Sequence, residues 1–298
     1  MSKITRNIET YDAYAKSILS RKSVLSYILM YLVPEYKGMN TEYIKQCIED
    51  GDNNPSVHGI SNDVSVDGKQ IRYDICFKTK SPINNTNMYI NIEPQYYDNE
   101  YDIHYRAEYY ASRLIDIQKD IEIKDSNFNE LKKVYSIWLI FNAKTKRNFI
   151  LKNDNKYYEF EYDIENHEYH KSINDKSESV FNVIIVYLDE IENLHHKGLF
   201  ELLFTIFKYN KDQIQERDKI LEKLYGIIDI RKEQIKMCSL GEGIARENRL
   251  EGSINTATSN VCNLINSLNW SLEKAIETLK IDDSIKEEVI KQVKLKLN

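Results

Sequence analysis

The chain has 298 residues, of which 42% are hydrophobic and 30% are charged, a balance typical of a globular protein and not of a disordered one. Its formal net charge of −6 argues against a uniformly basic surface for nucleic acid. No apolar run approaches the ~20 residues of a membrane span, and the N-terminal stretch lacks the apolar region of a signal peptide, so we expect a cytoplasmic protein without a membrane partner.

The N-terminal part of the chain favours helices. Apolar residues recur at helical spacing over residues 8–33, with an interruption near residues 20–22. Pro34 ends this segment, since proline cannot continue a helix. A second short helix is predicted over residues 41–50, and the polar, Gly- and Pro-containing residues 51–61 predict a loop.

The pattern then changes to the period of two that indicates strands. The stretch DVSVDGKQIRYDICF (residues 63–77) has an Asp67-Gly68 turn between alternating runs, which is a strong hairpin signal. NMYINIEPQ (residues 87–95) predicts the next strand. We therefore expect an antiparallel meander in which the second strand carries Asp74 and the third carries Glu93.

Helical spacing returns near residues 100–118, and further strands follow. VYSIWLIFN (residues 134–142) is almost continuously β-branched and aromatic, as is typical of a central strand that is buried on both faces. Three other strand candidates are residues 148–152, 157–164 and 182–188.

From residue 196 the pattern is helical almost to the end, and Gly241, Gly243 and Gly252 predict breaks and a hinge. We divide the chain into a core over residues 1–195, a helical extension over residues 196–240 and a helical tail over residues 241–298. The tail is a candidate for homo-oligomer formation.

Two carboxylates stand inside the apolar strand runs, where an ionised group is costly unless it is paired or bound to a metal. Glu93 and Gln95 share one strand face because they are two residues apart, and Asp74 on a paired strand can lie opposite them. Such hard oxygen ligands suit Mg²⁺, and the carboxamide of Gln95 could orient a water. The alternative is that each carboxylate lies on a solvent face or pairs with Lys or Arg, and Pro94 favours an edge strand or a bulge.

Four segments resemble, in their order, the recombination-promoting nuclease/putative transposase family, also called PD-(D/E)XK nuclease family transposases. They are GKQIRYDICF, YINIEPQ, YRAEYYASRLI and LKKVYSIWLIFN. The family's opening helix is similar to the earlier segment SVLSYILMYLVPEYKGM. The family's tail is similar to two later segments, IKMCSLGEGIARENRLEG and NLINSLNWSLEKAIETLKI. The resemblance covers most of residues 20–282.

This resemblance implies an α/β fold with a restriction-endonuclease-like mixed central sheet, flanked by helices and followed by a helical C-terminal extension. It implies an Mg²⁺-dependent DNA endonuclease, with Mn²⁺ as an alternative ion. Asp74 and Glu93 match the metal ligands of the D…E-x-K pattern, and Gln95 stands where the lysine is usual. Glu35 matches a glutamate at the end of the first helix and is either a further ligand or simply a helix-end carboxylate.

Replacing Lys by Gln removes a positive charge that would stabilise the transition state. Arg106 is our candidate for the missing cation because it matches an arginine of the family, although it could equally be a surface arginine. The basic residues of 142–156 could bind phosphate even in an acidic chain. The competing interpretation is a catalytically weak or inactive DNA-binding or interaction module on the same fold.

Overall fold

The computed structural model divides the chain into two compact units, Tyr11–Cys238 and Met1–Thr10 together with Ser239–Asn298. The described residues are 3–48, 56–57, 63–66, 69–95, 102–119, 121–141, 147–153, 156–163, 168–189, 198–209 and 211–297. The larger unit ends at Cys238, beside the hinge expected at residue 241. The first ten residues are grouped with the C-terminal unit and not with the core. None of the described helices is long and apolar enough to cross a membrane.

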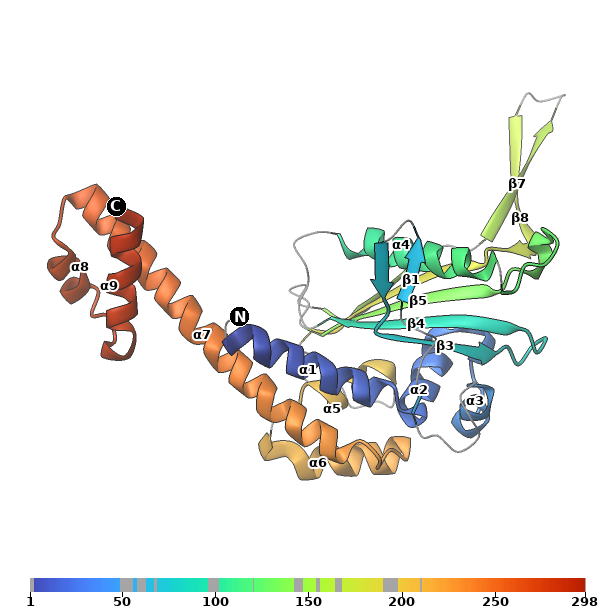
Figure 1. The fold of residues 1–298 in the computed structure, drawn as a ribbon, viewed down its shortest axis with the longest axis horizontal. Coiled ribbons are helices and arrows are strands. Elements are labelled where there is room, and N and C mark those ends of the chain that lie inside the picture. Colours follow the sequence, from blue (N-terminus) through green and yellow to red (C-terminus); the bar gives the residue numbers. More distant parts are fainter. Residues whose placement is uncertain are drawn as a thin grey trace. The chain divides into compact units, whose positions relative to one another are not determined.

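A five-stranded mixed sheet is the centre of the larger unit (Figure 1). Its strands, in spatial order, are β3 (Ile75–Lys80), β4 (Asn87–Gln95), β5 (Lys133–Ile140), β9 (Phe181–Tyr187) and β6 (Phe149–Lys152). The β4–β5 and β5–β9 pairs are parallel, while both edge strands run antiparallel to their neighbours. The protein is therefore of the α/β class, with a mixed sheet as the sequence predicts.

Helices cover both faces of this sheet (Figure 1). Helix α4 (Ile103–Asp116) packs on one face through Ile103, Ala107, Ala111 and Leu114. On the other side lie α1 (Lys3–Leu19), α2 (Lys22–Leu32), η1 (Pro34–Tyr36), α3 (Thr41–Cys47) and α5 (Leu199–Phe207). The larger unit also contains η2 (Ile117–Lys119), η3 (Phe128–Glu130), η4 (Lys211–Gln213), α6 (Ile214–Ile220), η5 (Leu221–Tyr225) and the start of α7 (Arg231–Leu268).

The position of the central strand β5 explains why its sequence is almost continuously apolar. Val134, Trp138 and Ile140 belong to the core beneath α4. The alternate side chains Tyr135 and Ile137 point to the opposite face and are also buried. Because both faces are covered, a polar residue at either set of positions would need a partner, and the prediction of a buried central strand from this run is confirmed.

Helices α1 and α2 confirm the interruption predicted near residues 20–22. In α1, Tyr11, Ala15, Ile18 and Leu19 are buried, which is one stripe at the spacing of an amphipathic helix. This stripe packs the part of α1 from Tyr11 onward on the larger unit.

Two hairpins stand apart from the central sheet. Over the described residues, β1 (Asp63–Val66) pairs with β2 (Lys69–Arg72) alone, and β7 (Lys156–Asp163) pairs with β8 (Glu168–Glu178) alone. The predicted hairpin around residues 67–68 is thus present, although the turn residues lie outside those described. The expected three-stranded meander is wrong, because the chain bends at Asp74 and starts a new strand, β3, that pairs with β4 instead.

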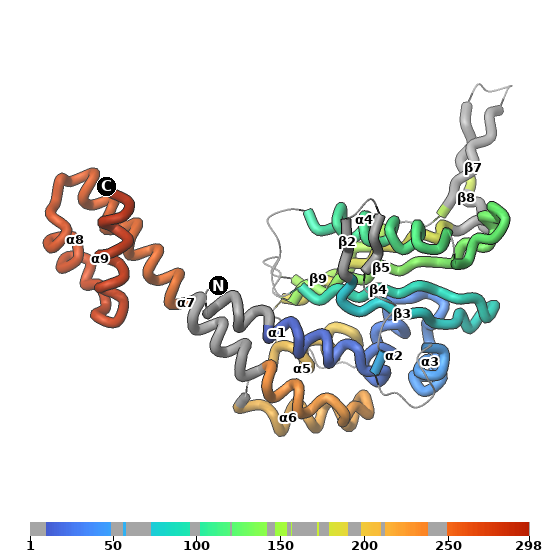
Figure 2. Tube along the Cα trace, in the orientation of Figure 1, coloured from blue at the N-terminus to red at the C-terminus, as the bar shows by residue number. Residues whose placement is uncertain are grey.

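The C-terminal unit contains the second part of α7 together with α8 (Leu272–Thr278) and α9 (Asp283–Leu297), as Figure 2 traces. Its core joins Val261 of α7, Ile276 of α8 and Val289 of α9. The predicted breaks at Gly241, Gly243 and Gly252 are wrong, since α7 continues through all of these positions. A glycine weakens a helix by about 1 kcal/mol but does not by itself end it.

Candidate active site

The structure brings Asp74 and Glu93 together, as the sequence predicts. The register pairs Ile75 with Ile92, so the next position outward sets Asp74 opposite Glu93. The backbone N–H of Asp74 donates to Oε1 of Glu93 at 3.0 Å. The Glu93 residue is 1% exposed and the Asp74 side chain 17% exposed. Asp74 lies in the bend before β3 and not within a strand, which leaves its carboxylate nearer to solvent than that of Glu93.

The carboxyl group of Glu93 is electrostatically perturbed. Burial and, next, the charge of Asp74 raise the pKa of Glu93 to about 8, while the backbone hydrogen bond from Asp74 and the carboxamide of Asn91 lower it. Burial and a neighbouring like charge both disfavour the ionised form. A cation between the two carboxylates would remove this penalty, and strongly perturbed acids cluster at functional sites.

Asn91 adds a neutral polar group beside the pair. It is two residues before Glu93 on β4, so both side chains point to the face covered by α4. Asn91 is fully buried, and its carboxamide lies near enough to Glu93 to lower the pKa of that acid, although neither its Nδ2 nor its Oδ1 atom has well-formed hydrogen-bond geometry with any described residue. A buried amide in this condition is costly unless water or a ligand satisfies it.

Lys16 supplies a positive charge that the sequence analysis did not identify. Its ammonium group forms an ion pair with Oδ1 of Asp74. Lys16 lies on α1, next to the buried stripe that holds this helix. A lysine in an amphipathic helix gives no local sign of what it contacts, so only the tertiary structure could reveal this residue.

Gln95 shares the strand face of Glu93 but does not contact the carboxylates. Its Nε2 atom donates to the Pro94 carbonyl oxygen at 3.0 Å. Within the part of the chain that the structure describes, no hydrogen bond joins Gln95 to Asp74 or Glu93. The bond to Pro94 engages the Nε2 donor of Gln95, so of its two polar atoms it is the Oε1 acceptor that could orient a water.

Arg106 lies on α4 above the same sheet face. Its Cζ atom is 5.1 Å from the ring centroid of Trp138, which is the β5 register partner of Glu93. Its Nη2 atom donates to the Tyr110 hydroxyl at 3.1 Å. Burial raises the pKa of Tyr110, Arg106 lowers it, and the charges of Glu93 and Asp74 raise it further. The Arg106 guanidinium thus lies near the carboxylate pair, because the Tyr110 hydroxyl interacts electrostatically with Arg106 and with both carboxylates.

Glu35 is not part of this arrangement, contrary to its assignment as a metal ligand. Its Oε1 atom accepts from Lys133 Nζ at 2.8 Å, and its Oε2 atom accepts from the Tyr135 hydroxyl at 2.6 Å. These partners point to the sheet face opposite Glu93. Lys133 is also five positions before the register partner of Glu93, or about 16 Å along the strand. Of the two interpretations of Glu35, the structure favours a helix-end carboxylate with its own partners.

The carboxylate pair fits a divalent cation in part. Two carboxylates that converge, one of them destabilised by burial and by its neighbour, provide the oxygen donors that Mg²⁺ uses alongside waters and substrate phosphate. Over the described residues, no group of three or more His, Cys, Asp or Glu side chains is arranged to hold a metal ion. The remaining ligands of such an ion would be water and substrate.

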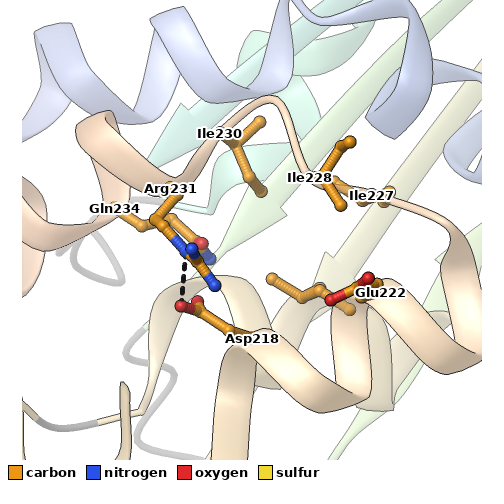
Figure 3. Close-up of a pocket in the computed structure, with 8 residues that line it drawn as sticks. Asp218, Glu222, Ile227, Ile228, Ile230, Arg231 and Gln234 are labelled. Atoms are coloured by element: carbon orange, nitrogen blue, oxygen red, sulfur yellow. Dashed lines mark ion pairs between the residues drawn. The ribbon is translucent and has the colours of Figure 1, made fainter. Parts of the chain in front are cut away.

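A cavity in the larger unit lies among its helices, away from the carboxylate pair (Figure 3). It is a cavity of about 360 Å³ whose polar side chains include Asp218, Glu222 and Arg231, and Arg231 Nε is 2.6 Å from Asp218 Oδ2. Its apolar lining includes Ile227, Ile228 and Ile230. Asp218 is ion-paired there with Arg217 and Arg231, whereas at the Asp74–Glu93 pair the pKa of a buried acid is raised by burial and by a second acid. We therefore place the candidate active site at the pair.

Comparisons with models of known protein families, with curated proteins and with solved structures found no match to this chain.

Proposed function

We propose that the protein is a metal-dependent DNA endonuclease of the recombination-promoting nuclease type, with the central sheet serving as a restriction-endonuclease-like core. The observation that carries this proposal is the pair of Asp74 and Glu93, in which a nearly inaccessible acid has its pKa raised by burial and by a second acid. Structural carboxylates are usually held by cations or donors that keep them ionised. An acid pair of this kind is better explained by a ligand that the site binds.

In the proposed site Asp74 and Glu93 hold Mg²⁺, with Mn²⁺ as an alternative, and Glu35 is no longer included. The bound ion would supply an acidified water and neutralise charge on the cleaved phosphate. Hydrolysis forms a bond between the water oxygen and phosphorus and breaks one phosphorus–oxygen bond of the DNA backbone. The attacking water loses one proton to solvent, and the leaving oxygen takes one, so the products are a phosphate monoester and a hydroxyl.

The residues around the pair would position the reactants. Gln95, through its Oε1 atom, could accept a hydrogen bond from the attacking water. Arg106 rests on the rings of Tyr110 and Trp138, from where it could bind a DNA phosphate beside the cleaved one. The proposed DNA partner also requires other basic side chains, and part of the basic segment at 142–156 lies outside the described residues.

The C-terminal unit would add self-association to this activity. It has its own apolar core, and Leu250, Leu268 and Leu295 expose much of their side chains. We propose that these leucines contribute to a homo-oligomer, which light scattering of the intact protein and of a Leu268→Ser, Leu295→Ser variant would test.

Cleavage of supercoiled plasmid and of labelled single strands tests the nuclease function. The reactions contain Mg²⁺, Mn²⁺ or EDTA, and compare wild type with Asp74→Asn and Glu93→Gln. Glu122→Gln is the matched control, since Glu122 is a partly buried acid held instead by Tyr89 and Lys78. The proposal predicts metal-dependent cleavage that both site variants lose and the control retains. Binding of DNA without cleavage by wild type would favour the interaction module instead.

A further inference from the structure

The ion pair between Lys16 and Asp74 joins a cation from α1 to an acid of the candidate active site. The stripe of Tyr11, Ala15 and Ile18 is buried, so the packing of α1 carries Lys16 to Asp74. The Lys16 side chain is 40% exposed, so the ion pair lies at the edge of the packed helix, where part of this side chain faces solvent.

The other cationic candidate is otherwise engaged. Arg106 donates to Tyr110 and rests on the Trp138 ring. Gln95, at the position where a lysine is usual, is neutral and bonded to the backbone. Among the described residues, the cation that the structure places in contact with the carboxylate pair is Lys16.

We propose that Lys16 is the cationic residue of this active site and contacts the scissile phosphate. The role rests on the proposed nuclease function. In the absence of DNA the ammonium group neutralises Asp74. When Asp74 binds a divalent cation, the Lys16 ammonium leaves this ion pair, and its three N–H donors can bind a non-bridging phosphate oxygen. Lys16 gives up no proton and forms no covalent bond, because its contribution is charge that is in place before the reaction.

This role has two consequences of opposite sign. Lys16 and a divalent cation compete for the Asp74 carboxylate, so removing the ammonium should tighten metal binding. The same change should slow cleavage, because the transition state loses a positive charge. An ion pair that served only to hold α1 would not give this combination. Its loss would leave the cleavage rate of a folded variant unchanged, or it would weaken metal binding and cleavage together by disturbing the fold.

The test compares Lys16→Gln, Lys16→Met and Lys16→Arg with wild type. Lys16→Met keeps most of the apolar stem and serves as a second neutral variant if the glutamine variant folds poorly. Lys45→Gln is the matched control, because Lys45 pairs with Glu42 on α3 at 2.6 Å and is unrelated to the site. For each protein we would measure thermal unfolding, Mn²⁺ affinity without DNA by electron paramagnetic resonance, and the single-turnover cleavage rate at saturating Mg²⁺.

We expect the neutral Lys16 variants to cleave about 100-fold more slowly, the loss typical of removing one group that stabilises transition-state charge. They should also bind Mn²⁺ several-fold more tightly, and Lys16→Arg, which keeps the positive charge, should cleave faster than either neutral variant. Lys45→Gln should match wild type in both measurements. A folded neutral variant that cleaves at the rate of an active wild type would overturn this role alone, as would weaker Mn²⁺ binding. An inert wild type would overturn the nuclease function and this role together.

Discussion

Replacing Glu93 by Gln should stabilise the protein in the absence of metal, although most buried substitutions destabilise. Gln has nearly the shape of a protonated Glu, and its Oε1 atom can still accept from the Asp74 N–H, which lies at 3.0 Å from Glu93. The folded-state pKa of Glu93 is raised from its ordinary 4.5 to about 8. The stability that the protonated carboxyl group contributes is therefore fully present below its ordinary pKa, and it is lost as pH rises through the folded-state pKa.

The size of the effect follows from the linkage between proton binding and folding. A difference of one in pKa corresponds to about 1.4 kcal/mol, so wild type should lose about 4 kcal/mol of unfolding free energy between about pH 5 and about pH 8 through this group. Glu93→Gln lacks the titration and should exceed wild type by a similar amount at about pH 8. The remaining pH dependence, which other groups cause, should be common to both proteins.

Urea denaturation of wild type and Glu93→Gln across this pH range, with EDTA present, measures the difference directly. The two proteins are compared at each pH, so that groups that titrate independently of Glu93 cancel. A Glu93→Gln protein that is less stable than wild type at the alkaline end would refute the argument that Asp74 and burial make the ionised form of Glu93 unfavourable.

Three further predictions concern groups outside the carboxylate pair. Partial burial raises the pKa of Glu122, but hydrogen bonds from Tyr89 and Lys78 outweigh it and lower the pKa. Glu122→Gln should therefore lower the unfolding free energy by about 1 kcal/mol at neutral pH. In urea denaturation this difference from wild type should vanish as pH falls through the folded-state pKa of Glu122. Tyr135→Phe removes a buried donor to Glu35 and should cost about 1–3 kcal/mol with no loss of DNA cleavage, and a large loss of cleavage would restore Glu35 to the site. Val261→Ala should lower the unfolding free energy of the C-terminal unit, whose core contains Val261, by about 2 kcal/mol. In calorimetry the transition temperature of that unit should fall while that of the larger unit stays in place, and a shift of both transitions would show that the units unfold together.

The sequence predicts the central sheet well because burial leaves a direct mark on composition. The run over residues 134–142 is apolar or aromatic at all positions except Ser136 and Asn142, a pattern that a strand needs only when both faces are covered. The proximity of Asp74 and Glu93 is also predictable, since two neighbouring strands of opposite direction bring their facing positions together.

The less regular elements leave weaker marks. Strand β8 has the polar sequence EYHKSINDKSE and pairs only with β7, so no apolar alternation marks it. Helix α7 contains glycines that suggest breaks, yet each adds only a small cost that its neighbours can offset.

The partners of the site residues could not be predicted, because they are tertiary contacts. Glu35 and Tyr135 are 100 residues apart in the sequence, and no local pattern indicates that they meet. Lys16 is a lysine in an amphipathic helix like many others, and its contact with Asp74 depends on how α1 packs. The rotamer that bonds Gln95 to the Pro94 carbonyl is likewise not encoded in residue type or spacing.

The central claim is that Asp74 and Glu93 together bind a divalent cation, and direct Mn²⁺ titration tests it independently of any DNA substrate. Electron paramagnetic resonance would follow free Mn²⁺ in the presence of wild type, Glu93→Gln and Glu122→Gln. The account predicts one site in wild type and in Glu122→Gln, and an affinity at least about tenfold weaker in Glu93→Gln, in line with the loss of a charged ligand. Equal Mn²⁺ affinity in wild type and Glu93→Gln would contradict it.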